Sequence, residues 1–303
     1  MNGKLKTAIL HIAYRFSSRL LQAPVPTWSK RWYWSRVCGP YLSWRELRLP
    51  CRTQFGAPMW AQPTQFVENR ILFFGVWEPN ITAWFMRLLK PGDVVLDVGA
   101  NVGYYTLLSS KLVGSAGKVY AVEPSPSIRG RLENNLRLNH PDNVSVLPFA
   151  AWSSQGQATF HIHGKDCGSS SLSTLEDCAA TETVDLVRLD DVLDRRDAAR
   201  LRIVKLDIEG AEYHALQGLR ATLAAAPNAV VLCELNPALL SALGGSIEEV
   251  ALLVGELGFR GNVVPNDYRV EAYLQGQRTA SCEPLRGPVT EAIDTLSCRT
   301  DCC

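Results

Sequence analysis

The chain has 303 residues, 47% of them hydrophobic, and a formal net charge of +1. This length suits one large domain with additions or two small ones, and the composition is that of a globular protein with a substantial core. The overall charge is too small to call for nucleic acid or a membrane as a partner. The charge is nevertheless uneven, because residues 1–52 contain ten lysines and arginines and one acidic residue, whereas the remainder contains 21 basic and 29 acidic residues.

Residues 1–60 form a basic, tryptophan-rich N-terminal extension. The first twenty residues have the pattern of an amphipathic helix, and several prolines prevent a longer one. Interleaved aromatic and basic side chains suit a cap that packs on the following domain, a peripheral contact between residues 1–52 and an anionic membrane, or, least favoured, a contact with nucleic acid.

No stretch approaches the roughly 18 uninterrupted apolar residues of a spanning helix, and the N-terminus is a poor secretory signal. Nine cysteines, an odd number without regular spacing, do not suggest a disulfide framework. We therefore expect a cytoplasmic protein.

Residues 61–276 are expected to form the main domain. A polar centre in residues 65–74 predicts a hairpin, and residues 78–90 predict a helix that ends at a Pro-Gly pair. Alternating strands and helices then predict an α/β fold with a doubly wound, Rossmann-like parallel sheet. The predicted core strands are residues 94–98, 118–123, 144–150, 202–207 and 229–234, and the predicted helices are residues 102–113, 126–139, 211–226 and 246–257.

Several segments are expected to lie outside this regular pattern. Alternation in residues 158–163 predicts an extra hairpin, residues 164–182 are expected to be a flexible loop, and residues 183–189 a further strand. Two weaker strands are expected near residues 260–264 and 270–274, and residues 277–303, which contain four cysteines, are expected to be a disordered tail.

The segment from Asp97 to Gly103 joins the first core strand to its helix. Gly99 and Gly103 allow a tight turn and a close approach of the backbone to a ligand. Asn101 stands where the dinucleotide pattern G-x-G-x-x-G has its second glycine, which argues for a ligand without a pyrophosphate, such as S-adenosylmethionine. We expect Asp97 to bind the amino-acid portion of that ligand.

Glu123 ends the second core strand at the same edge of the sheet, where an acid accepts hydrogen bonds from ribose hydroxyls in other adenosine sites. Thr106, Ala150 and Asp207 complete the predicted cofactor-binding residues.

Lys205, Asp207 and Glu209 share one face of a predicted strand, because they stand at positions i, i+2 and i+4. A strand buried on both faces is normally apolar, so these charges need an explanation. They form either a buried structural ion pair or a catalytic group at the carboxyl end of the strand. In the second case, we expect Asp207 or Glu209 to be a general base, with Lys205 orienting the carboxylates or stabilising a developing alkoxide.

Glu234 ends the fifth core strand at the same edge, so the predicted cleft is lined by acidic residues and suits a cationic ligand such as a sulfonium. A metal ion is not expected. A weaker alternative is Mg²⁺ bound by the carboxylates of Asp207 and Glu234, since oxygen ligands suit that ion.

Three motifs together resemble the FkbM-type methyltransferases: the segment Asp97–Thr106, Glu123-Pro-Ser-Pro126 with a later Asn134, and Lys205-Leu-Asp-Ile-Glu-Gly-Ala-Glu212. The resemblance covers about residues 65–265, with its core at about 94–260. It implies a class I methyltransferase fold and transfer of a methyl group from S-adenosylmethionine to a hydroxyl of a sugar, glycan, glycolipid or natural-product scaffold.

Three alternatives stay open beside this reading. An RNA ribose methyltransferase would use the same fold, with the basic N-terminal segment contacting phosphates. A nicotinamide oxidoreductase is disfavoured by Asn101. A non-catalytic adenosine-ligand-binding protein is disfavoured by the intact set of Lys205, Asp207 and Glu209.

Overall fold

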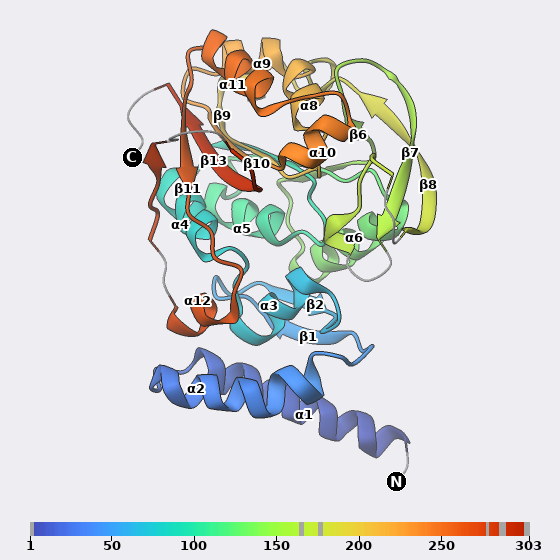
Figure 1. Ribbon diagram of the computed structural model, residues 1–303, viewed down its shortest axis with the longest axis vertical. Helices are drawn as coiled ribbons and strands as arrows, with labels where there is room; N and C mark the ends of the chain where they lie inside the picture. Colours follow the sequence, from blue (N-terminus) through green and yellow to red (C-terminus); the bar gives the residue numbers. More distant parts are fainter. Residues whose placement is uncertain (1–2, 164–166, 175–177, 277–278, 285–288, 300–303) are drawn as a thin grey trace.

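Three tiers follow one another along the long axis of the molecule (Figure 1). The N-terminal helices lie at one end, a small hairpin with two helices follows, and the main α/β sheet occupies the other end. The computed structural model describes residues 3–163, 167–174, 178–276, 279–284 and 289–299.

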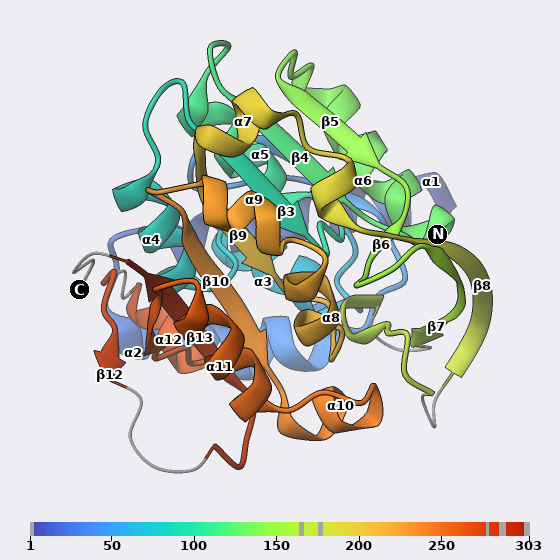
Figure 2. The ribbon, with the colours of Figure 1, turned by 90° about the horizontal axis from the view of Figure 1, so that it is seen from above.

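The main sheet has eight strands in the order β12-β11-β13-β10-β9-β3-β4-β5 (Figure 2). Its strands are β3 (Val94–Val98), β4 (Lys118–Val122), β5 (Val144–Leu147), β9 (Leu201–Leu206), β10 (Val230–Leu235), β11 (Arg260–Val264), β12 (Glu283–Pro284) and β13 (Ile293–Cys298). Five neighbouring strands, β10, β9, β3, β4 and β5, are parallel to one another. The chain moves outward from β3 first to β5 and later, through β9, to β10. The predicted doubly wound, Rossmann-like fold is confirmed, with its topological switch point between β3 and β9.

Each face of the sheet belongs to its own hydrophobic cluster, because successive side chains of a strand point to opposite faces. Val95 and Ile203 pack in one cluster with α4 (Pro79–Leu88) and α5 (Tyr104–Val113). Leu96 and Val204 pack in the other, whose helices are α8 (Glu212–Gln217), α9 (Arg220–Ala225) and α11 (Ile247–Glu256). Helices therefore cover both faces, as the sequence predicts.

Helix α6 (Pro126–Asn139) has the predicted bounds because its first turn is capped. The backbone N–H of Ile128 donates to the Ser125 hydroxyl over 3.2 Å. Pro126 suits the first position of the helix because it lacks a backbone N–H, and an N–H there would have no partner within the helix. The predicted helix at residues 211–226 is instead two helices, α8 and α9. They separate at Gly218, where a Cβ atom would lie 2.0 Å from the carbonyl oxygen of Trp152.

A second, three-stranded sheet lies beside the end of the main sheet and has the order β6-β8-β7 (Figure 2). Its strands are β6 (Ala150–Ala151), β7 (Gly156–His163) and β8 (Cys178–Val187). The predicted extra hairpin is confirmed by the antiparallel pair β7–β8. Strand β8 begins before the predicted residue 183, so the expected loop at 164–182 is wrong over residues 178–182; residues 164–166 and 175–177 lie outside the described chain.

The hairpin predicted at residues 65–74 is wrong, because this segment is helix α3 (Phe66–Phe74). Its polar centre is buried rather than placed at a turn. The carboxylate of Glu68 accepts from the backbone N–H of Gln62 over 2.7 Å, and the Asn69 amide donates to the carbonyl of Pro63 over 2.8 Å. The neighbouring hairpin is formed earlier, by β1 (Leu49–Arg52) and β2 (Pro58–Ala61).

The N-terminal end of the molecule consists of α1 (Gly3–Gln22), α2 (Thr27–Tyr33) and a π-helical segment η1 (Trp34–Leu42). The predicted amphipathic helix is confirmed in α1, whose Tyr14 and Leu21 are buried in the same cluster as α3. None of the described helices combines the length and the apolar character needed to cross a bilayer.

Two expectations for the C-terminal part of the chain are wrong. Residues 270–274 are not a strand but part of helix α12 (Val270–Gln275), which packs near α2 and α3. The expected disordered tail contains β13, which lies between β10 and β11 and is antiparallel to both. The main sheet is therefore mixed rather than parallel. Residues 277–278, 285–288 and 300–303 lie outside the described chain.

The position of β13 predicts a large stability effect. Leu296 in β13 is fully buried, so Leu296→Ala is expected to lower the free energy of unfolding by about 2–5 kcal/mol. The matched control Leu252→Ala removes a leucine that is 64% exposed and is expected to change it by about 0.5 kcal/mol or less. Urea unfolding followed by circular dichroism measures both. Equal effects would contradict the placement of β13 inside the sheet.

Candidate active site

Two adjoining pockets lie at the carboxyl edge of the main sheet, around the ends of β3, β4, β9 and β10. The first reaches towards the small sheet and includes Glu123, Ala150 and Phe160. The second reaches towards α3 and α5 and includes Asp97, Lys205 and Glu234. Both share the residues Gly99, Asn101, Gly168, Asp207 and Glu209. The predicted edge of the sheet is thus where the pockets are found.

The glycine turn after β3 brings two strand ends into contact. Gly99 has a φ of +83°, and a Cβ atom there would lie 1.9 Å from the carbonyl oxygen of Asp207. The close approach that requires glycine is therefore to the end of β9. Gly103, at the start of α5, lines neither pocket, and a Cβ atom there would lie 2.5 Å from the side chain of Leu132.

Glu123 is held at the end of β4 by the turn opposite it. One carboxylate oxygen accepts from the backbone N–H of Asn101 over 3.0 Å, and the other accepts from that of Ser125 over 3.1 Å. Asn101 itself has a left-handed backbone, with a φ of +49°. Burial raises the pKa of Glu123 to about 8, although both backbone N–H groups favour the charged form.

Asp97 and Thr106 form a buried pair. The Thr106 hydroxyl donates to the carboxylate of Asp97 over 2.6 Å. Asp97 lines the second pocket, whereas Thr106 is fully buried and lines neither pocket. Thr106 therefore orients the carboxylate of Asp97 and is not itself placed to contact a ligand. Burial raises the pKa of Asp97, and the Lys205 ammonium opposes this rise.

Lys205 is the charged centre of the second pocket. Its Nζ donates to Oδ2 of Asp207 over 2.5 Å and lies 4.9 Å from the centre of the Tyr105 ring. Burial alone would lower its pKa, but the carboxylates of Asp207, Glu78 and Asp97 raise it above the usual value, so the ammonium stays charged. In return, Lys205 holds the pKa of Asp207 below its usual value in spite of burial.

Glu209 follows in a backbone conformation that non-glycine residues rarely adopt, with a φ of +52°. The next helix supports this turn, since the buried carboxylate of Glu212 accepts from the backbone N–H groups of Ile208 and Gly210 over 3.0 Å. The Ser171 hydroxyl also donates to the Glu209 carbonyl over 2.7 Å. A strained residue held from two sides at a pocket is a common feature of functional sites.

Three further carboxylates gather beside the second pocket. Oxygens of Glu78, Glu234 and Asp294 lie within 4.8 Å of one another, and Asp294 stands opposite Glu234 in the β10–β13 pair. The Tyr268 hydroxyl lies 2.8 Å from Oε1 of Glu78 and 3.3 Å from Oδ2 of Asp294. The weaker alternative from the sequence was a metal ion bound by Asp207 and Glu234. Asp207 is not one of the three residues in this carboxylate group.

Burial raises the pKa of all three carboxyl groups above their usual values. Burial, with the charge of Asp207, raises the pKa of Glu234 to about 11, and burial, with the charge of Glu78, raises that of Asp294 to about 8. Sequence reasoning missed Glu78, Tyr268 and Asp294. Glu78 is the first residue of the predicted helix 78–90, Tyr268 lies between the two weaker predicted strands, and Asp294 lies in the expected disordered tail.

Comparison with known proteins decides the family. The model of the methyltransferase FkbM domain matches residues 97–260, which is more than half of the chain. This chain belongs to the FkbM methyltransferase family. The matched residues run from Asp97 in β3 to the start of β11 and so include the carboxyl edge of the sheet.

Three curated relatives match different shares of the chain. The hexuronic acid methyltransferase AglP of Haloferax volcanii is 27% identical over 47% of this chain and 56% of its own length. The 31-O-demethyl-FK506 methyltransferase FkbM of Streptomyces tacrolimicus is 27% identical over 43% and 61%. The AMB antimetabolite synthetase AmbE of Pseudomonas aeruginosa is 26% identical over 83% and 13%. The chain spans less than two thirds of the length of each.

The raised pKa of Asp294 predicts a specific pH dependence of stability. A carboxyl group with a raised pKa stabilises the fold most at low pH, and this contribution is lost as the pH rises from its usual value of 3.8 to about 8 for Asp294. Asp294→Asn keeps an acceptor oxygen but cannot ionise. We expect its melting temperature to fall less than that of the wild type between about pH 5 and about pH 9. Parallel curves in thermal unfolding would show that Asp294 does not titrate in this range.

Proposed function

We propose that this protein transfers a methyl group from S-adenosylmethionine to a hydroxyl of a sugar, glycan, glycolipid or natural-product scaffold. Membership of the FkbM methyltransferase family supports methyl transfer. The observation that carries the proposal is the pair of pockets that meet at Asp207 and Glu209, because a donor and an acceptor must meet at one point. The names of two relatives, one acting on a hexuronic acid and one on a demethylated FK506, support the acceptor class.

The first pocket is proposed to hold the adenosine. Glu123 lies at the end of β4, where its carboxylate is available to ribose hydroxyls, and apolar side chains of Ile128, Ala150 and Phe160 line the space beside it. The methionine portion then extends past the turn at Gly99 towards Asp97 in the second pocket. This path leads the sulfonium into the part of the site where carboxylates are concentrated.

The second pocket is proposed to hold the acceptor and the general base. A hydroxyl is a weak acid, so methyl transfer benefits from a group that removes its proton. Asp207 is a poor proton acceptor because Lys205 holds its pKa low. We therefore assign the base to Glu209, which lines both pockets, and assign Lys205 to orienting Asp207. A metal ion has no step in this scheme.

The cofactor assignment is tested by calorimetric titration with S-adenosylmethionine, with NADH as the control ligand. At about pH 9, where Glu123 is ionised, we expect wild-type protein to bind S-adenosylmethionine and Glu123→Ala to bind it roughly tenfold to a hundredfold more weakly, the range for a lost hydrogen bond to a charged group. Folded wild-type protein that binds NADH but not S-adenosylmethionine would contradict the assignment.

The raised pKa of Glu123 also predicts that ligand affinity depends on pH. Because ribose hydroxyls donate best to the ionised carboxylate, affinity for 5′-methylthioadenosine should rise between about pH 6.5 and about pH 9 as a group with a pKa of about 8 ionises. This ligand lacks the amino group of S-adenosylmethionine, which would titrate in the same range. Glu123→Gln should remove the rise.

The catalytic assignment is tested with trideuteromethyl-labelled S-adenosylmethionine and a panel of hexuronic-acid glycans, hydroxylated macrolides and RNA. We expect labelled O-methyl products from the first two classes, unchanged by a metal chelator. Glu209→Gln should lower kcat by roughly 10²–10⁴-fold while cofactor affinity stays within a few-fold. The exposed-residue control Glu248→Gln should keep wild-type kcat. Labelled RNA ribose as the sole product would instead support the RNA methyltransferase alternative.

A further inference from the structure

Exposed apolar side chains are concentrated at one end of the molecule. Of the eleven large hydrophobic residues that are exposed among the described residues, seven lie between residues 9 and 44. These seven are Ile9, Ile12, Phe16, Trp28, Trp32, Tyr41 and Trp44. We call α1, α2, η1 and the loop to residue 48 the N-terminal layer. A concentration of this kind on a surface marks an interaction site.

Helix α1 presents apolar side chains on two sides. Tyr14 and Leu21 face the protein and are 2% exposed. Ile9, Ile12 and Phe16 follow the spacing i, i+3 and i+7, which places them on one stripe, and they are 47%, 69% and 58% exposed. The inward stripe accounts for the packing of α1 in the fold, so the outward stripe has a different role.

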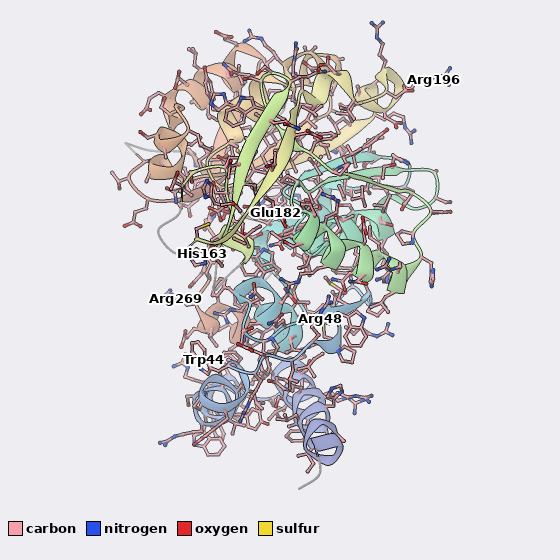
Figure 3. All side chains as sticks on the ribbon, turned by 90° about the vertical axis from the view of Figure 1, so that its right-hand side faces the viewer. Trp44, Arg48, His163, Glu182, Arg196 and Arg269 are labelled. Carbon is pink, nitrogen blue, oxygen red and sulfur yellow. The ribbon has the colours of Figure 1, made fainter. Side chains whose placement is uncertain are left out.

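Helix α2 continues this outward surface. The Phe16 ring lies 6.2 Å from the Tyr33 ring, and the Ser17 and Tyr33 hydroxyls are 2.9 Å apart, so the two helices lie side by side (Figure 1). Trp28 and Trp32 are one turn apart and are 75% and 61% exposed. Trp44, which is 77% exposed, lies beside these helices at the opposite end of the molecule from Arg196 (Figure 3).

The charge of this layer identifies the kind of partner. Residues 1–52 contain ten basic residues and one acidic residue. The arginines at positions 15, 19, 31, 36, 45 and 48 are exposed, and no ion pair found among the described residues involves them. Tryptophan and tyrosine favour the interface between water and lipid, and arginine and lysine favour anionic headgroups.

We propose that the N-terminal layer binds the surface of an anionic lipid bilayer. Binding is peripheral: the apolar stripe of α1 and the exposed tryptophans enter the headgroup region, and the arginines contact lipid phosphates. Arg70 of α3 links the layer to the second pocket, because its guanidinium lies 5.9 Å from the Trp34 ring and 4.6 Å from the ring of Phe66, which lines that pocket. This inference does not depend on the proposed methyl transfer.

The test is co-sedimentation of the full chain with vesicles. We expect the wild type to bind vesicles of phosphatidylcholine and phosphatidylglycerol in roughly equal amounts at least tenfold more tightly than vesicles of phosphatidylcholine alone, and to be released by salt. The variant Trp28→Ser/Trp32→Ser/Trp44→Ser should bind at least tenfold more weakly. Arg15→Gln/Arg19→Gln/Arg31→Gln should lose roughly fivefold per charge removed, the factor equivalent to about 1 kcal/mol per residue.

Matched control variants distinguish binding through the N-terminal layer from nonspecific adsorption to vesicles. Leu252→Ser removes an exposed apolar side chain from α11, and Arg195→Gln/Arg196→Gln removes two exposed charges from α7 (Arg195–Ala199) at the far end of the molecule. Both should bind vesicles as the wild type does. Circular dichroism confirms that each variant is folded.

Three outcomes would overturn the proposal. The first is folded wild-type protein that stays in the supernatant with both kinds of vesicle. The second is a dimer in sedimentation velocity that the tryptophan variant abolishes, because a second copy of the chain would then cover this face. The third is vesicle binding that the control variants weaken as much as the variants of the N-terminal layer.

Discussion

One buried ammonium group balances the negative charge at the carboxyl edge of the sheet. Lys205 is 4% exposed and donates a hydrogen bond to Asp207. The carboxyl groups of Glu78 and Asp97 are close enough to raise its pKa. A buried carboxylate without a cation costs several kcal/mol, or it takes up a proton. Asp207, which has the ammonium beside it, has a lowered pKa, whereas burial raises the pKa of Glu234, further along the same edge, to about 11. The direct hydrogen bond from Lys205 thus keeps the pKa of Asp207 low, whereas burial outweighs the ammonium at Asp97 and raises its pKa.

The second constraint is the contact between the ends of β3 and β9. The backbone of Gly99 lies so close to the carbonyl of Asp207 that there is no room for a Cβ atom. This contact lies at the topological switch point of the sheet. It fixes the distance between the turn that holds Glu123 and the strand that carries Lys205. The two pockets consequently meet at one place, so the same residues are available to a ligand in either pocket. The small sheet and α3 close the pockets from opposite sides.

Local signals in the sequence were sufficient for much of the main domain. The sequence predicts strand β3 at its observed bounds because it is a short apolar run before a glycine turn, and α6 because Ser125 and Pro126 mark its start. Glu123, Lys205, Asp207 and Glu209 were predicted to meet because the carboxyl ends of parallel strands lie at one edge of a sheet. In contrast, the sequence predicts that Thr106 and Gly103 contact the cofactor, but in the structure neither residue lines a pocket. Thr106 bonds Asp97, and Gly103 packs against Leu132.

The sequence by itself thus determined the α/β class, the positions of the central strands along the chain and the acidic edge, because each depends on residues close together in the chain. Only the tertiary structure decided that residues 66–74 are a helix and that residues 293–298 are a strand within the sheet. Buried polar residues such as Asn69 and Asp294 resemble turn or tail residues until their partners, which are distant in sequence or in another element, are known. For the same reason, only the fold brings Glu78, Glu234 and Asp294 within 4.8 Å of one another from three separate parts of the chain.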